Sequence, residues 1–349
     1  MKEKSIRKIA FAYVGSFAGA GFISGQEIMQ FFAKFGGYGI LAEIICGILF
    51  FSITLISIFI VRKTGDVGIE NIIAGDKTFF RKFFSSFFNA FFFSVVTIMI
   101  AGFGSLLEEL TGIDERLASF IVIIPVFIIA NFGAKGVSES MNIIMPGLTI
   151  LLVIISVFGG FKGSGEFFSI ANTADNPLLG NFFLSMLSFM AYNIIVAIAV
   201  FNAMYEKTDK KTLIKGSGLG IFIYLLIIVS MTYQMIIHFP DVQNVSFPML
   251  VIAGKISPVL EKSFSILLLA GFFGCIVNLL FTFTVKVNRI GSLTGWKLNL
   301  VLLLIAYFLS AVGFKELIGV IYPITGYIGF IAVVMVFIHY LKLRKASSQ

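Results

Sequence analysis

The stretch YVGSFAGAGFISGQE, residues 13–27, decides how the fold of this chain is read. It lies in the first long apolar run of the sequence, yet it carries several glycines and a glutamate. Gly15 and Gly19 form one GxxxG pair, and Gly21 and Gly25 form another, so close packing between helices is one interpretation. On a regular helix, however, Gly15 and Gly21 are about 240° apart, and one packing face cannot hold both pairs. The sequence therefore favours an interruption of this helix close to Gly19.

Composition places the chain in a lipid bilayer. Hydrophobic residues make up 58% of the 349 and charged residues 13%, and the mean hydropathy is +1.01. A soluble domain normally carries about a quarter charged residues. Apolar runs of about twenty residues recur along the whole chain, each long enough to cross a hydrocarbon core about 30 Å thick. Because the alternation of barrel strands is absent, helices must satisfy the backbone in lipid. The sequence predicts an all-α polytopic membrane protein.

About ten transmembrane helices are predicted from these runs. Their approximate ranges are 6–33, 37–61, 83–107, 117–133, 140–160, 180–204, 213–237, 260–285, 297–312 and 316–340. The loops between them are too short for a core of their own, so residues 1–349 are expected to form a single transmembrane domain.

The basic residues predict how the chain is oriented. Most of the 26 lysines and arginines fall in segments on the same side as both termini. The exceptions are Lys34, Arg116, Lys162, Lys255, Lys262 and Lys315. Because cytoplasmic segments are enriched in Lys and Arg, both termini are expected in the cytoplasm, in a multi-pass protein of a bacterial plasma membrane. This bias also accounts for the net charge of +8 without a nucleic acid partner.

Other classes of protein find little support in the sequence. Cys46 and Cys275 lie within predicted spans and offer neither a disulfide framework nor metal spacing. His238 and His339 lie at predicted membrane edges, and no HExxH motif, Ser/His/Asp grouping or phosphate-binding loop accompanies them. We therefore expect no enzyme, no cofactor and no obligate protein partner; the expected partners are the bilayer, a small solute and a coupling ion.

An interrupted first helix would have a chemical consequence. The residues after the break begin a half-helix whose N–H groups and positive dipole end can hold a carboxylate. Such sites at the membrane midplane mark secondary transporters built from inverted repeats. Span six begins about half a chain later, and its middle, LSFMAYNIIVA (residues 187–197), places Ser188, Tyr192 and Asn193 among apolar neighbours. A second break and a polar contact between two helices are the alternatives there.

The stretch GSFAGAGFISGQE, the ten spans and the short length together resemble the YkvI-like membrane permeases of the amino acid–polyamine–organocation (APC) superfamily. This resemblance implies a LeuT-like fold of two inverted five-helix repeats, with spans one and six broken around a central site. The first repeat would cover about residues 6–160 and the second about 180–340. The resemblance does not imply a substrate.

The resemblance also implies where the solute lies. In span six the equivalent break is expected from Phe189 to Asn193, with Tyr192 or Phe189 as an aromatic wall or gate. Core packing is the alternative for either ring, above all for Phe189. In span one, Phe22 and Ile23 are expected to open the outer half-helix. The implied substrate-binding set is Gly19, Ala20, Gly21, Phe22, Ser188, Phe189, Tyr192 and Asn193, with Thr97 from a polar face of span three.

A sodium ion is one candidate for the coupling ion. Gly271, Gly274, Cys275, Asn278 and Thr282 share one face of span eight. In the resembled fold this helix completes a sodium site with backbone carbonyls of span one. The implied ligands are Gly15, Ala18, Asn278 and Thr282, with helix packing as the alternative reading of the same face.

A proton is the other candidate. Glu27 and Glu43 lie within predicted spans, where a carboxylate costs several kcal/mol unless it is paired or protonated. Glu27 is therefore a candidate proton carrier, although a structural role as a brace for the half-helix is the alternative. Glu43 could instead reach the membrane interface. Span five contains no Lys or Arg, so a proton device based on a lysine there is not expected.

These observations predict a secondary active transporter of an amino acid or a similar zwitterion or amine, working by alternating access and coupled to Na⁺ or H⁺. The alternative is a ligand sensor of the same fold, comparable to the subunits of spore germinant receptors. A channel is less well supported because no filter sequence is present.

Overall fold

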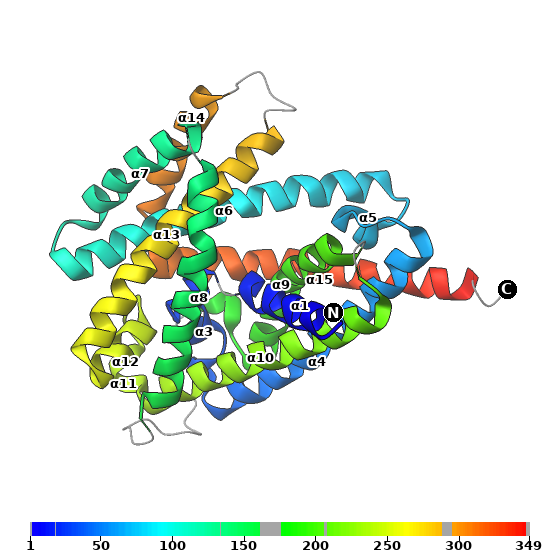
Figure 1. Ribbon diagram of the computed structural model, residues 1–349, viewed down its shortest axis with the longest axis horizontal. Coiled ribbons are helices and arrows are strands. Elements are labelled where there is room, and N and C mark those ends of the chain that lie inside the picture. The colour runs from blue at the N-terminus through cyan, green and yellow to red at the C-terminus, as the bar shows by residue number, and fades with distance from the viewer. Residues whose placement is uncertain are drawn as a thin grey trace.

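The computed structural model describes residues 2–17, 19–132, 134–160, 176–205, 208–287 and 295–346. Within these ranges the chain is helical almost throughout, and they contain no strand (Figure 1). The helical class predicted from the sequence is confirmed.

The helices follow the predicted spans, and five short α-helices, α2, α3, α5, α11 and α12, lie within the first span or between spans. The α-helices are α1 (Lys2–Phe17), α2 (Ala20–Ile23), α3 (Gln26–Phe31), α4 (Gly37–Thr64), α5 (Ile69–Ala74), α6 (Thr78–Thr111), α7 (Glu115–Phe132), α8 (Ala134–Phe158), α9 (Phe182–Tyr205), α10 (Lys210–Ile237), α11 (Phe239–Val242), α12 (Pro248–Ile256), α13 (Pro258–Val287), α14 (Trp296–Ser310) and α15 (Phe314–Ala346). Two 3₁₀ helices are η1 (Ala33–Phe35) and η2 (Pro177–Leu179).

Five of the described helices, namely α4, α6, α10, α13 and α15, are long and apolar enough to cross a membrane. Shorter apolar stretches lie in α8, α9 and α14. Many large apolar side chains on these helices face outward, such as Ile48 at 62% and Ile266 at 67% exposure. In lipid such a surface needs no partner, and the architecture is that of a polytopic membrane protein. The count of ten spans stays a prediction.

The helices form two groups that meet around the first span. In one group, α1 packs along α10, α9 packs along α15, and α4 lies against both α9 and α10. In the other, α13 packs against α6 and α8, and α14 lies against α6 and α7. The short helix α2 contacts α6, α8 and α13, so it lies where the two groups meet.

The first span is interrupted, as the glycines predict. α1 ends at Phe17, and helical structure resumes at Ala20 as the single turn α2. A second interruption, which the sequence analysis did not predict, follows at Ser24 and Gly25. The outer half-helix therefore begins at Gln26 rather than at Phe22, because Gly25 takes the left-handed conformation (φ 89°) and turns the chain there.

The predicted break in span six is wrong. α9 runs from Phe182 to Tyr205 as one helix and contains neither glycine nor proline. The polar residues that suggested a break have partners compatible with a helix. Asn193 Nδ2 donates to the carbonyl of Phe189, four residues earlier, at 3.1 Å. Ser188 Oγ donates to the carbonyl of Pro323 on α15 at 3.2 Å, so its role there is a contact between two helices.

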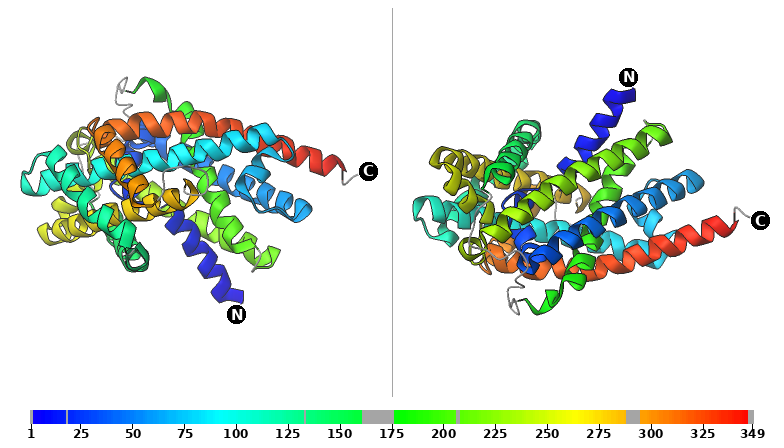
Figure 2. Two further views of the ribbon diagram at one scale, coloured as in Figure 1. Left: turned by 90° about the horizontal axis from the view of Figure 1, so that it is seen from above. Right: turned by 90° about the horizontal axis from the view of Figure 1, so that it is seen from below.

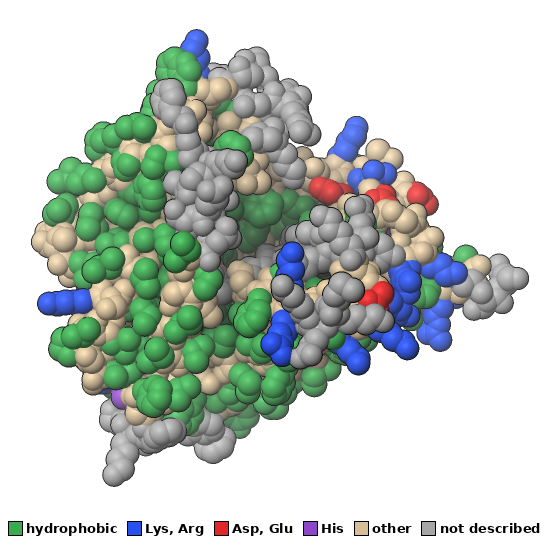
Figure 3. Space-filling model, in the orientation of Figure 1, with side chains coloured by type: hydrophobic (Ala, Val, Ile, Leu, Met, Phe, Trp, Pro, Cys, Tyr) green, Lys and Arg blue, Asp and Glu red, His purple; other side chains and the backbone are tan. Residues whose placement is uncertain are grey.

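Basic side chains are concentrated at one end of the molecule. We call this the inner end: α1 and α6 begin there and α4 and α15 finish there, and both chain ends point to this side (Figure 2). Arg62 and Lys63 close α4, and Arg344 and Lys345 close α15. Figure 3 shows Lys and Arg gathered at this end, beside a face that is otherwise largely hydrophobic. The opposite end, where α3, α11 and α12 lie, is called the outer end.

Candidate functional site

The interruption of the first span is stabilised by local hydrogen bonds. The Ser24 hydroxyl donates to the carbonyl of Gly21 at 2.6 Å and accepts from the backbone N–H of Gln26 at 3.2 Å. Serine side chains commonly replace backbone partners in this way at turns. The short helix α3 is therefore held in a fixed direction, and its residues Gln26 and Glu27 are buried inside the bundle.

Glu27 is joined to α9 by a hydrogen bond from the hydroxyl of Tyr192. Both side chains are buried, at 6% and 3% exposure. The side chain of Asn193 also contacts this carboxyl, and no Lys or Arg among the described residues interacts with it. A carboxyl in such surroundings is unfavourable as an isolated anion, so it must share a cation or hold a proton.

Aromatic rings surround this contact. The ring of Tyr192 stacks on that of Tyr322 from α15, with centroids 5.1 Å apart and an interplanar angle of 23°. Phe31 and Phe189 approach Tyr192 at centroid distances of 5.7 and 5.5 Å. Carboxyl and aromatic groups together are a setting in which proteins bind ammonium groups.

Pro323 explains how α15 presents Tyr322. A proline inside a helix removes the hydrogen bond to the carbonyl four residues earlier, which here is Gly319. That carbonyl instead accepts from Asn176 Nδ2 at 2.9 Å. The polar group that proline leaves unpaired is thus satisfied by the segment before α9, and α15 keeps its place beside the first span.

A second buried carboxyl lies on α4. Glu43 is completely buried and accepts a hydrogen bond from the hydroxyl of Thr232 on α10. Its other oxygen, Oε2, has no hydrogen-bond partner among the described residues. The buried hydroxyl of Tyr224, also on α10, has no hydrogen-bond partner among the described residues. Glu43 therefore faces the interior of the bundle rather than the membrane interface.

The structure brings together only part of the predicted substrate set. Tyr192 and Asn193 contact Glu27, and Phe189 belongs to the same aromatic cluster. Gly21 lies nearby on α2, since a Cβ placed there would be 3.5 Å from the hydroxyl of Tyr322. Ser188 points to α15 instead.

Four other predicted substrate residues have no described contact with the carboxyl. Phe22 is buried against Tyr224, with ring centroids 5.5 Å apart. The hydroxyl of Thr97 donates to the carbonyl of Phe93 in its own helix. Gly19 links α1 to α2 through its backbone, and the side chain of Ala20 lies outside the described residues.

The predicted sodium ligands stay a prediction. Ala18 lies outside the described residues. Gly15 is exposed, and no atom of another described element lies within 4 Å of a Cβ placed on it. Thr282 is exposed and its hydroxyl donates to the carbonyl of Asn278 at 2.8 Å. The described residues contain no group of three His, Cys, Asp or Glu side chains that could hold a metal ion.

A hairpin of two short helices, α11 and α12, closes over the first span at the outer end. The backbone N–H of Met249, on α12, donates to the carbonyl of Ser24 at 3.2 Å. Gly25 fits beneath it because a Cβ there would lie 2.8 Å from Met249 Cγ. We call this hairpin the outer lid.

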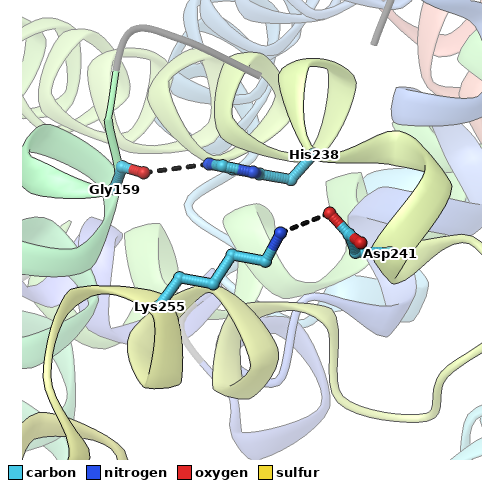
Figure 4. A network of polar contacts seen from close by, with 4 residues as sticks. All are labelled: Gly159, His238, Asp241 and Lys255. Atoms are coloured by element: carbon cyan, nitrogen blue, oxygen red, sulfur yellow. Dashed lines mark hydrogen bonds and ion pairs between the residues drawn. The ribbon is translucent and has the colours of Figure 1, made fainter. Parts of the chain in front are cut away.

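Two polar contacts fasten the hairpin (Figure 4). The ring of His238 hydrogen-bonds through Nε2 to the carbonyl of Gly159, at the end of α8, at 2.9 Å. Asp241 on α11 forms an ion pair with Lys255 on α12. The hydrogen bond from Lys255 lowers the pKa of Asp241.

Sequence reasoning missed three buried residues around the first span and the two buried acids. Tyr322 precedes the only proline of the last span, and that proline was the available sequence signal for a local irregularity in α15. Thr232 gave no signal, since it is one of several hydroxyl residues in its span. Gln26 was quoted within the opening stretch but not recognised as a buried polar group.

Comparison with known proteins supports the membrane class. No family model matches the chain. The chain is 26% identical over 347 residues to the uncharacterized membrane protein YkvI of Bacillus subtilis (strain 168), a match that covers 98% of this chain and 96% of YkvI. The similarity spans the whole length, so it supports a shared membrane-protein architecture. Membership of the APC superfamily stays a prediction.

Proposed function

We propose that this chain is a secondary active transporter of an amino acid or a similar small amine or zwitterion, working by alternating access. The observation that carries the proposal is the contact between Glu27 and Tyr192. It places a buried carboxyl, without a basic partner among the described residues, beside the interruption of a membrane-spanning segment. Ionisable groups inside membrane proteins mark ion and substrate pathways.

The surroundings of Glu27 favour a solute that carries an ammonium group. The carboxyl would accept hydrogen bonds from the ammonium, and the rings of Tyr192 and Tyr322 would attract its charge. While Glu27 is ionised, a substrate without a cationic group would leave a buried carboxylate unbalanced. Amino acids and small amines meet this requirement, whereas sugars and inorganic anions do not.

For the coupling ion, the structure supports protons more directly than sodium. Glu27 and Glu43 are buried acids without a cationic partner among the described residues, and each becomes neutral when it takes up a proton. Sodium at Gly15, Ala18, Asn278 and Thr282 is the alternative. The two readings differ in which gradient should drive uptake.

The helix pairings support the proposed inverted repeat. If each helix of the first half is exchanged with its equivalent in the second half, the pair α1 and α10 becomes the pair α9 and α4, and both pairs are packed. The pair α6 and α14 likewise becomes α13 and α7, which also pack together. Such a molecule can alternate by moving one group of helices against the other.

The test is uptake of radiolabelled amino acids and amines into proteoliposomes, driven in turn by a pH gradient and by a sodium gradient. The key variant is Glu27→Gln, which keeps the shape of the side chain and removes its charge. We expect gradient-driven accumulation to fall at least about tenfold, because the variant loses an interaction that the transition state of transport requires. Glu70→Gln, on α5 at the inner end, is the matched control and should transport normally.

Three results would revise the proposal. Normal accumulation by Glu27→Gln would remove Glu27 from the mechanism. Accumulation driven by sodium alone would move the coupling ion to the site on α13. Binding of amino acids without uptake under any gradient would favour the ligand-sensor reading.

A further inference from the structure

A cavity lined in part by polar side chains lies at the outer end, apart from Glu27. It has a volume of about 340 Å³, within the range of roughly 300–1,000 Å³ typical of sites for small molecules. It is lined by α3 with η1, by η2, by α11 with the residues after it, and by the first turns of α15. The polar side chains that line it include Gln26, Gln30, Lys34, Gln243, Lys315 and Glu316.

Gln26 is the residue that points to a ligand. Its side chain is completely buried, yet neither its amide nitrogen nor its amide oxygen has a hydrogen-bond partner among the described residues. Buried amides in native proteins are almost always paired. A solute that offers both an acceptor and a donor would satisfy the two halves of this amide.

The walls of the cavity are fixed without that solute. Gln30 Nε2 donates to the carbonyl of Lys315 at 3.2 Å, and Asn176 Nδ2 donates to Gln30 Oε1 at 3.2 Å. These bonds join α3, η2 and α15 at the outer end. Gln26 is therefore held in place by a framework that does not use its own amide.

The charges around the cavity match a zwitterion. Lys315 reaches over it, with Nζ donating to the carbonyl of Gln243 at 3.4 Å, and Lys34 adds a second cation that is itself buried. Glu316, next to Lys315 on α15, supplies a carboxylate. The lysines suit the carboxylate of an amino acid, Glu316 suits its ammonium group, and Gln26 suits a polar uncharged side chain.

We propose that this cavity is an outer binding site for a zwitterionic amino acid with a polar, uncharged side chain, distinct from the site at Glu27. The proposal rests on the proposed function for the class of solute, and it adds a second place where that solute binds.

The test is protection of a cysteine placed in the cavity. Val320 lines the cavity and is 47% exposed, so Val320→Cys can react with a charged methanethiosulfonate reagent. The background carries Cys275→Ala, and Cys46 is buried. The probe is L-glutamine, whose side-chain amide can pair with that of Gln26, and L-leucine is the comparison. Val312→Cys, 56% exposed and outside the lining, is the control.

We expect L-glutamine to slow modification of Val320→Cys at least about fivefold, L-leucine to slow it less, and neither to affect Val312→Cys. Gln26→Leu should abolish the protection, and Glu27→Gln should preserve it. If Gln26→Leu fails to fold, Lys315→Gln tests the same site. This variant should fold, because Gln30 donates its hydrogen bond to the backbone carbonyl of residue 315, which the substitution leaves in place. Lys315→Gln should weaken the protection severalfold.

Two outcomes would overturn the proposal: no protection by L-glutamine, or protection that survives Gln26→Leu but disappears in Glu27→Gln. The second pattern would mean that binding at Glu27 closes the cavity from a distance. Protection without uptake into proteoliposomes would leave this site standing and refute the proposed transport. Uptake without protection would support the proposed transport and refute the outer site.

Discussion

At the scale of single residues, one hydrogen bond defines the candidate site. The hydroxyl of Tyr192 is the donor to a carboxyl that has no basic partner among the described residues. Inside a bundle, the cost of leaving such an acceptor unpaired is larger than the net gain of an average hydrogen bond. The contact therefore matters for folding as well as for binding.

Tyr192→Phe should destabilise the protein by about 1–3 kcal/mol, because it leaves a carboxyl oxygen of Glu27 without its donor. It should also weaken binding of amino acids. Thermal unfolding of the purified protein, with and without an amino acid panel, measures both effects. Tyr38→Phe is the matched control. Tyr38 is 44% exposed, and a phenylalanine in its place would still stack on Phe182. Equal effects of the two substitutions would contradict the assigned role.

At the scale of elements, the contrast between the first span and α9 is instructive. Glycine supplies backbone conformations that other residues avoid, and the chain uses one of them at Gly25. α9 has polar residues but no glycine or proline, and its polar groups bond to carbonyls of helices. Polar side chains inside a span therefore did not signal a break by themselves, whereas clustered glycines did.

Gly25→Ala should loosen the outer lid. Its Cβ would lie 2.5 Å from Met235 Cε and 2.8 Å from Met249 Cγ. Because Met249 belongs to α12, this helix would have to move away from the first span. Gly65→Ala is the matched control, because Gly65 has a similar φ of 72° but a Cβ there would meet no neighbouring atom of the described residues within 4 Å. Both substitutions carry a left-handed strain of about 1–2 kcal/mol, and only the first adds a clash.

The readout for Gly25→Ala is the reactivity of Leu250→Cys, a buried position on α12, in a Cys275→Ala background. We expect modification to accelerate at least about tenfold in Gly25→Ala and to stay unchanged in Gly65→Ala, because free-energy differences of about 1.4 kcal/mol change a population tenfold. If both glycine variants behave alike, strain rather than the fit of the lid is responsible.

At the scale of the whole molecule, the charge pattern and the lid make the two ends different. Basic side chains close α4 and α15 at the inner end, and the polar cavity and the hairpin lie at the outer end. In a membrane the basic end is expected to face the cytoplasm.

A thiol reagent that cannot cross membranes should therefore distinguish two exposed positions. In intact cells it should label Asn244→Cys, beside the outer cavity, and it should label Asp76→Cys, after α5, only once the membrane is permeabilised. Both variants belong in the Cys275→Ala background. The reverse pattern would place the termini outside.

By itself, the sequence determined the properties that depend on neighbours along the chain. Apolar runs specify membrane helices because lipid leaves the backbone no other partner. Clustered glycines indicated the interruption in the first span, and isolated acids indicated Glu27 and Glu43 as groups to examine. These signals are local, so one sequence was enough to read them.

Only the tertiary structure decided which groups meet. Tyr192 is 165 positions from Glu27, and Thr232 is 189 positions from Glu43. A polar residue in a helix can bond to its own backbone, to a neighbouring helix or to a buried acid, and the sequence pattern is the same in each case. The packing of α9, α10 and α15 around the first span selects among these partners, because it fixes which side chains share the interior.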